Sequence, residues 1–165
     1  MFTKQQFERL ASAHMDGAFR LAYSYLKSAA EADDVTQNAL LKLYLADKRF
    51  ESEAHVKNWL YRVAANECKR ALLSPWRRAE DIADYAEALA FTEPERSDLF
   101  YAVMELSAKY RAVIHLHYYE DYSTQEIAEI LGIPAATVRT RLRRGRELLK
   151  TKLMEAEGYA GQENV

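Results

Sequence analysis

Residues 123–152 read STQEIAEILGIPAATVRTRLRRGRELLKTK, a stretch with two helical patterns on either side of one glycine. Ser123 and Glu126 have the spacing of a capping box, in which the serine hydroxyl accepts a first-turn backbone N–H and the glutamate reaches back to the cap. The apolar residues that follow at helical spacing are Ile127, Ala128 and Leu131. The pattern predicts a short helix that begins after Ser123.

Gly132 predicts the turn between the two helices. A glycine readily adopts the left-handed conformation that ends many helices, and it lets the chain turn before Pro134. The second helix is expected from about Ala135. Its inner stripe is Val138, Leu142, Gly145 and Leu149. With the small Ala128 where the helices approach each other, this order predicts a helix-turn-helix whose second helix faces a DNA major groove.

The outer face of the second helix is cationic. Between 139 and 152 there are seven basic residues and one acid, Glu147, so ion pairs within the helix cannot neutralise the charge. The basic residues are Arg139, Arg141, Arg143, Arg144, Arg146, Lys150 and Lys152. A merely solvated helix face is the alternative interpretation. The excess of arginine favours a nucleic acid, since guanidinium groups pair with phosphates and with guanine edges.

The composition limits the class of protein. The chain has 165 residues, of which 49% are hydrophobic, and this suits one ordinary domain or two small ones. No apolar run approaches the length of a membrane span, and the first ten residues, MFTKQQFERL, lack the pattern of a signal peptide. We therefore expect a cytoplasmic protein with no direct membrane insertion.

Cysteine and histidine give no sign of a metal centre or of an internal disulfide. Cys68 is the one cysteine, and it is expected to be a small core residue. The four histidines, which lack the spacing of metal ligands, are His14, His55, His115 and His117. No nucleophile–base pair or phosphate-binding loop is visible either. We therefore expect no metal, no cofactor and no enzymatic activity.

The rest of the chain is also expected to be helical, because glycine and proline are few and no strand-like alternation occurs. Two capping patterns, Thr3 with Gln6 and Ser28 with Glu31, predict a first helix that ends near Lys27 and a second that ends near Ala46. A third helix is expected to stop before Pro75. Its inward stripe is Val56, Trp59, Leu60, Val63 and Ala64. Its other face carries Asn58, Arg62, Asn66 and Lys69.

The distribution of charge indicates two domains. Residues 74–98 contain three basic and seven acidic side chains, whereas residues 1–73 contain eleven and nine. We predict an all-α protein with helical domains at 1–73 and 97–155, an acidic linker at 74–96 and a disordered tail at 156–165. The net charge of −2 indicates that the chain needs a partner to bind DNA tightly.

Three stretches resemble the extracytoplasmic-function (ECF) sigma factors. LSAKYRAVIHLHYYEDYSTQEIAEILGIPAATVRTRLRRGRELLK resembles their region 4, while EADDVTQNALLKLY and WLYRVAANECKRAL resemble region 2 and its promoter-binding helix. The resemblance covers residues 5–73 and 97–153. It implies a subunit that recruits bacterial core RNA polymerase to promoters and opens the DNA. It also implies control by an anti-sigma factor, which in many relatives is anchored in the membrane.

The resemblance assigns roles to particular residues. Those for the minus-35 element are Arg139, Thr140, Arg143, Arg144, Arg146 and Lys150, with the last two suited to phosphates. Those for the minus-10 element are Trp59, Arg62, Asn66 and Lys69, together with the loop that precedes their helix. Those for core polymerase are Asp33, Asp34, Gln37 and Asn38. The sequence departs from the family at Asn38, where an acid is usual, and in the loop RFESEAH, which is unusually acidic.

Several residues keep a second interpretation. Trp59 fits core packing better than base stacking, because it lies within the apolar stripe. Asp33 and Asp34 would also stabilise a helix N-terminus, and Thr140 and Arg144 would also fit as simple flanks of the packing stripe. The acidic linker either imitates nucleic acid inside polymerase or is an ordinary solvated connection.

Two other functions remain open from the residues alone. A stand-alone helix-turn-helix repressor or activator would dimerise and bind its operator without polymerase. A helical adaptor or anti-sigma-like interaction protein would not need Arg139 and Arg143.

Overall fold

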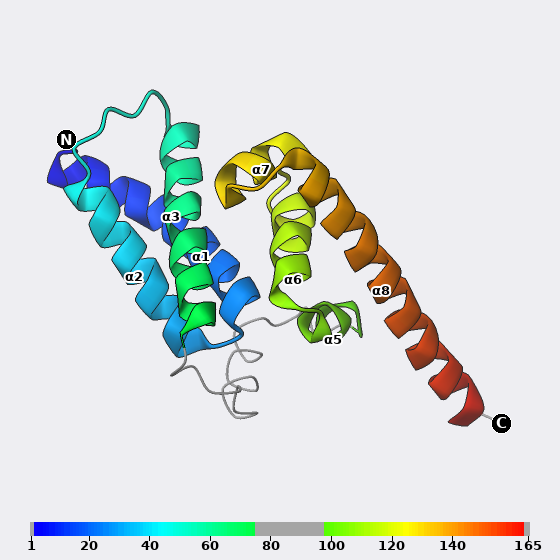
Figure 1. Ribbon diagram of the computed structural model, residues 1–165. Helices are drawn as coiled ribbons and strands as arrows, with labels where there is room; N and C mark the ends of the chain where they lie inside the picture. The colour runs from blue at the N-terminus through cyan, green and yellow to red at the C-terminus, as the bar shows by residue number, and fades with distance from the viewer. Residues whose placement is uncertain (1, 75–97, 164–165) are drawn as a thin grey trace.

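The computed structural model describes residues 2–74 and 98–163, which form helices and short connections without any strand (Figure 1). The first half consists of α1 (Lys4–Leu26), α2 (Ala29–Leu45) and α3 (Glu53–Leu73). The second half consists of α5 (Asp98–Glu105), α6 (Ala108–Ile114), the π-helix η1 (His115–Tyr119), α7 (Thr124–Leu131) and α8 (Ala135–Glu163). The predicted all-α class is confirmed. The predicted linker at 74–96 lies, except for residue 74, outside the described residues.

The three helices of the first half pack against one another around one apolar core. Its largest fully buried side chains are Leu21, Leu26, Leu43, Leu60, Tyr61 and Cys68. Full burial of a leucine stabilises a fold by about 1.5–3 kcal/mol, so this cluster holds the bundle together. The prediction that Cys68 is a core residue is confirmed.

Side-chain caps explain where these helices begin. The Thr3 hydroxyl accepts the Gln6 N–H at 3.1 Å, and the Gln6 side chain accepts the Thr3 N–H at 3.0 Å, which confirms the predicted capping box. At the start of α2 the Ser28 hydroxyl accepts the Glu31 N–H at 3.2 Å. The start of α3 depends on Ser52, whose hydroxyl accepts a backbone N–H three residues on. Each cap contributes about 0.5–2 kcal/mol.

The second half contains the predicted helix-turn-helix. Ser123 caps α7 by accepting the Glu126 N–H at 3.1 Å, and Gly132 ends α7 in the left-handed region with φ of 68°. Gly145 of α8 lies against α6, where an added Cβ would come within 2.8 Å of the Ile114 Cδ1 atom. The buried residues of the α8 stripe, Val138, Leu142 and Leu149, are the ones that the spacing predicts.

The helix α8 continues to Glu163, although the sequence analysis expected disorder over 156–165. That expectation is wrong for the described part of this segment, which is helical. Glu155, Ala156 and Glu157 have good helix propensity, and no proline follows to stop the helix. In Figure 1 this end of α8 extends away from the other helices. No helix of the described residues is long and apolar enough to cross a membrane.

The two halves lie side by side. The helix α6 contacts α1, and α7 contacts α3 (Figure 1). The helix α8 packs mainly on α5, α6 and α7 rather than on the helices of the first half.

Candidate nucleic-acid and polymerase interface

The arginines of α8 line two shallow grooves on the exposed side of the helix-turn-helix. Arg139, Arg143 and Arg146 lie along a groove of about 490 Å³ that α8 forms with α7 and η1. Arg141 and Arg144 lie along a second groove, of about 260 Å³, between α8 and α6. The helix therefore presents cations along both flanks of its outer face.

Thr140 lies between these flanks and borders both grooves. Its hydroxyl donates to the Ala136 carbonyl at 3.0 Å, so the methyl group and one side of the oxygen remain on the helix surface. Lys150, two turns further along α8 from Arg143, is exposed. The structure thus places all six predicted minus-35 residues on the outer surface of α8.

The positive charge of α8 is largely unpaired. Of the seven cations between 139 and 152, Lys152 forms an ion pair with Glu105 at 3.1 Å, and the other six form none with any described residue. Arg146 donates to the Tyr118 hydroxyl at 3.0 Å, a neutral partner that leaves its charge in place. Such a surface attracts a polyanion.

The polar face of α3 divides into an open part and a covered part. Arg62 and Asn66 are exposed, whereas Lys69 is partly buried and its ammonium group donates to the Leu131 carbonyl at the end of α7. Burial, and to a lesser degree the nearby Arg141 and Arg62 charges, lower the pKa of Lys69. The structure brings three of the predicted minus-10 residues onto one face, but one of them already has a partner in the second half.

Trp59 packs toward the loop before α3. Its ring is partly buried and meets the Phe50 ring edge to face, with centroids 5.6 Å apart and an interplanar angle of 81°. This contact agrees with the interpretation of Trp59 as a packing residue. Of the four residues predicted for the minus-10 element, Arg62, Asn66 and Lys69 are thus the ones on the polar face of α3.

On α2 the four residues expected to bind polymerase are all exposed. The Gln37 side-chain nitrogen donates to Asp33 Oδ2 at 2.9 Å. Because α2 begins at Ala29, Asp33 and Asp34 lie in its second turn, beyond the first-turn N–H groups where the positive end of the helix dipole is concentrated. Stabilisation of the helix end therefore explains these two acids poorly.

Large apolar side chains that were not predicted from the sequence lie beside these acids. Leu41 is 56% exposed, Tyr44 50% and Leu45 68%. Residues 34, 38, 41 and 45 follow one helical stripe, so apolar side chains continue the polar face toward the end of α2. The sequence feature that could have revealed them is the apolar pattern of α2, which is wider than the single stripe needed to face the core.

An apolar groove of about 550 Å³, also not predicted from the sequence, lies between α5, η1 and α8. Its apolar lining includes Leu99, Val103, Tyr119, Leu149, Leu153 and Met154. The groove forms where the part of α8 that follows the helix-turn-helix lies against α5 and η1.

Comparisons with known proteins identify the family. The chain matches Sigma-70 region 2 over residues 10–78 and Sigma-70, region 4 over residues 97–149. It is 30% identical to the ECF RNA polymerase sigma factor SigW of Bacillus subtilis (strain 168), over 90% of this chain and 89% of SigW. The chain belongs to the ECF sigma factors. It is also 30% identical to the RNA polymerase sigma-H factor of Pseudomonas aeruginosa, over 91% of this chain and 87% of that protein.

Solved structures of similar fold agree with this assignment. One is the sigma factor RpoE of Bartonella quintana in complex with the anti-sigma factor NepR, with a TM-score of 0.68, 22% identity and coverage of 90% of this chain and 96% of that chain. Another is CnrH in complex with the cytosolic domain of CnrY, with a TM-score of 0.63, 24% identity and coverage of 93% and 90%. As a member of the family shown by the two Sigma-70 matches and by SigW, this ECF sigma factor is a regulatory protein that directs core RNA polymerase to promoters.

In this sigma factor a buried arginine joins the two halves. Arg111 of α6 donates from Nε to the Ser24 carbonyl at 2.6 Å and from Nη2 to the Tyr25 carbonyl at 2.9 Å. Its third acceptor is the Leu106 carbonyl. Ser24 and Tyr25 lie in the last turn of α1, where carbonyls have no partner within the helix, so a side chain of the second half completes a helix of the first.

Glu120 forms a second link between the halves. Its carboxylate lies 3.4 Å from Lys57 Nζ on α3 and 3.8 Å from both Arg20 on α1 and His115 Nε2 on η1. Burial lowers the pKa of His115 to about 4, since the ring has little access to solvent, and Glu120 opposes that effect.

Tyr122 adds a hydrogen bond on the same side, where its hydroxyl donates to Asn58 Oδ1 at 2.7 Å. Burial raises the pKa of Tyr122, so the hydroxyl stays protonated and remains a donor. Asn58 is on the polar face of α3, so this bond and the Lys69 contact both lie on the predicted minus-10 face.

Proposed function

We propose that this ECF sigma factor binds the minus-35 element with the outer face of α8, the minus-10 element with the polar face of α3 and the loop before it, and core polymerase with the exposed face of α2. We assign region 2 to residues 1–73 and region 4 to residues 97–155. The protein acts in the cytoplasm. One solved structure of similar fold is a sigma factor in complex with the anti-sigma factor NepR, and another is CnrH in complex with the cytosolic domain of CnrY. We extend an anti-sigma partner, as in the first of these, to this chain.

The observation that carries the minus-35 assignment is the set of six cations on the second helix of a helix-turn-helix that form no ion pair with any described residue. Early positions of a recognition helix reach base edges, so Arg139, Thr140 and Arg143 are assigned to bases. Arg146 and Lys150 lie further along and are assigned to phosphates. Arginine suits the first task because its planar fork pairs with two acceptors of guanine.

The α2 assignment is supported by four exposed polar residues beside three exposed apolar ones. A stable protein interface combines an apolar centre with a polar rim, and this face offers both. The low net charge of the chain supports the same conclusion, because polymerase would supply the additional affinity for DNA.

The test is initiation by purified chain and core polymerase on a library of promoters with randomised minus-35 and minus-10 elements. Wild-type protein should select bases in both elements. Arg143→Ala should weaken selection at one or two minus-35 positions by about 1–3 kcal/mol, the usual value of a lost bidentate base contact, and leave minus-10 selection unchanged.

Lys4→Ala, which removes an exposed cation at the start of α1, is the matched control and should behave as wild type. An equal loss on all promoters would assign Arg143 to phosphate. Dimeric operator binding without polymerase, together with no polymerase-dependent initiation, would contradict the proposed function as a whole.

A further inference from the structure

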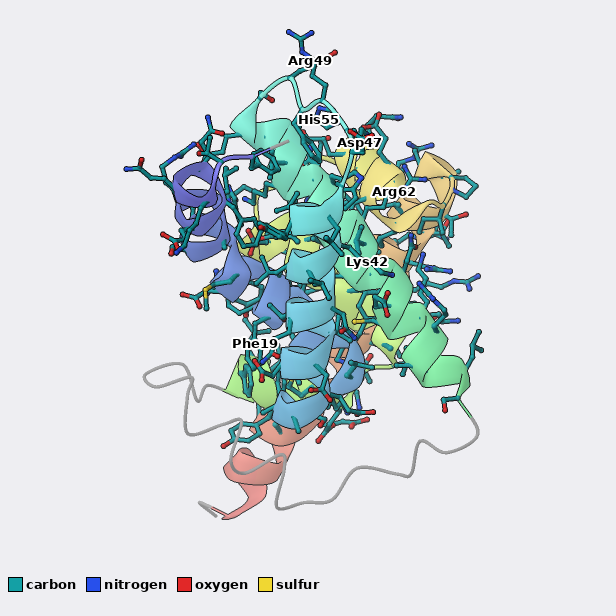
Figure 2. The ribbon with its side chains drawn as sticks, turned by 90° about the vertical axis from the view of Figure 1, so that its left-hand side faces the viewer. Phe19, Lys42, Asp47, Arg49, His55 and Arg62 are labelled. Carbon is teal, nitrogen blue, oxygen red and sulfur yellow. The ribbon has the colours of Figure 1, made fainter. Side chains whose placement is uncertain are left out.

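The 46–52 loop, which joins α2 to α3, presents charged side chains at its tip and turns one aromatic ring inward. Asp47, Lys48 and Arg49 are exposed, and Figure 2 shows Arg49 at the tip of the loop, pointing away from the helices. Phe50 is partly buried and packs against the core. The outer side of the loop is therefore open to a ligand, whereas its inner side is fixed by the packing of Phe50 against the core.

Three rings from two parts of the chain hold Phe50. Phe2, which precedes α1, stacks on it with centroids 5.5 Å apart and an interplanar angle of 18°. Trp59 and His55, both on α3, meet it edge to face at 5.6 Å and 5.1 Å. Both arrangements are attractive beyond the apolar area that they bury. Phe2 is the member of this cluster that lies outside both the loop and α3.

Polar contacts fix the end of the loop where α3 begins. The Glu51 N–H donates to His55 Nδ1 at 3.1 Å. The Glu53 carboxylate pairs with Arg9 at 3.3 Å and with His14 at 3.1 Å, and the Arg9 hydrogen bond lowers the pKa of Glu53. This end of the loop is thus anchored to α1 and α3 by hydrogen bonds, whereas the middle of the loop depends on ring packing.

A hollow of about 310 Å³ lies between the loop and the start of α1. Phe2 and Phe50 form part of its apolar lining, and its charged lining consists of Arg9, Lys48 and Arg49 together with the acids Glu51 and Glu53. Because the two stacked rings form part of this wall, a change in their packing changes the surface that the loop offers to DNA.

We propose that Phe2 is a positioning residue for promoter recognition: through Phe50 it sets the conformation of the 46–52 loop, and thereby the base preference of that loop at the minus-10 element. The inference rests on the proposed function, which places this loop at the minus-10 element. Phe2 contacts no base. It restricts the loop to one shape, and a loop held in one shape discriminates among bases better than one that adapts to each.

The experiment uses holoenzyme with the promoter library described above. Phe2→Ala is expected to lower base discrimination within the minus-10 element about two- to tenfold, the change that corresponds to one aromatic pair, without altering minus-35 discrimination or affinity for core polymerase. Phe2→Tyr keeps the stacked ring and is expected to restore discrimination. Phe19→Ala is the matched control, because Phe19 stacks on Tyr23 toward the opposite end of the bundle (Figure 2).

A double variant tests the route through Phe50. If Phe2 acts through that ring, Phe2→Ala has no further effect on discrimination in a Phe50→Ala chain, whereas additive effects would exclude this route. Unchanged minus-10 discrimination in Phe2→Ala, or an equal loss of initiation on every promoter, overturns the inference. A wild-type chain with no base preference at minus-10 would instead contradict the proposed function, so the two failures are distinguishable.

Discussion

The DNA-binding faces proposed for α8 and α3 differ in how accessible they are. On α8 six cations lie on the surface without an ion-pair partner among the described residues. On α3 the Lys69 ammonium donates to the Leu131 carbonyl, and Asn58 accepts from Tyr122. The first face can meet DNA in the observed arrangement, whereas the second cannot use Lys69 until the halves separate.

This difference shows that the contacts between the two halves can stabilise the fold and at the same time limit the access of DNA to α3. The contacts that cover α3 come from α7, the first helix of the helix-turn-helix, and from Tyr122, which precedes it. Region 4 therefore leaves open the helix that we propose to bind the minus-35 element, while it covers part of the polar face of region 2. Three changes test this comparison.

The largest expected effect is the loss of the link between the halves in Arg111→Ala. The substitution removes the donors to the carbonyls of Ser24, Tyr25 and Leu106. Each buried carbonyl left without a partner costs about 1–3 kcal/mol, so the free energy of unfolding should fall by about 4 kcal/mol in urea denaturation.

Two further variants isolate the cause. Arg111→Lys retains a cation but lacks the fork that reaches three acceptors, and its free energy of unfolding should lie between those of wild type and Arg111→Ala. Lys109→Ala removes an exposed cation from the same helix and should change the free energy by less than about 0.5 kcal/mol. An Arg111→Ala chain as stable as Lys109→Ala would show that the halves are held by other contacts.

A smaller effect is expected from pH, through His115. Burial holds the pKa of His115 at about 4, below its ordinary value of 6.5, so between these values the unfolded chain binds more protons than the folded one. The contribution of the neutral ring is fully present above pH 6.5 and is lost as the pH falls. The free energy of unfolding should therefore drop by about 2 kcal/mol between pH 7.5 and pH 5.

The matched variant for this effect is His115→Phe, which keeps a planar ring against Tyr119 and cannot be protonated. Its free energy of unfolding should lose most of that dependence on pH above 5. Glu120 and Arg20 are the charged groups nearest the ring, and both remain in the variant. An unchanged dependence on pH in His115→Phe would assign it to other groups.

The sequence predicts well what depends on neighbours along the chain. The helix starts at Thr3, Ser28 and Ser123 follow from caps within three residues, and the turn at Gly132 follows from backbone sterics. The exposed face of α8 is predictable for the same reason, since exposure follows from helical period once the packing stripe is known. The cationic face of α8 could therefore be predicted, because it depends only on residues that are near one another in the sequence.

Contacts between residues that are far apart in the sequence could not be predicted in this way. Nothing in the stretch around Arg111 indicates that its guanidinium completes α1, more than eighty residues away in the chain. The partner of Lys69 is likewise 62 residues away. The same limit applies to Phe2 and Phe50, which are far apart in sequence and stacked in the structure. These contacts depend on how whole helices pack, which local patterns do not encode.

The smallest effect on stability is expected at Lys69, where the comparison between the two faces is most direct. Lys69→Met keeps the apolar stem and removes one hydrogen bond at the surface of the interface, so the free energy of unfolding should change by less than about 1 kcal/mol. In holoenzyme, the same change should weaken promoter binding about fivefold on all minus-10 sequences and reduce the salt dependence by about one phosphate contact. Filter binding over a range of salt concentrations, with Lys4→Met as control, measures both the promoter affinity and its salt dependence. A Lys69→Met chain that is clearly destabilised but binds promoters normally would mean that Lys69 serves only the packed arrangement, and the polar face of α3 would then meet DNA through Arg62 and Asn66 alone.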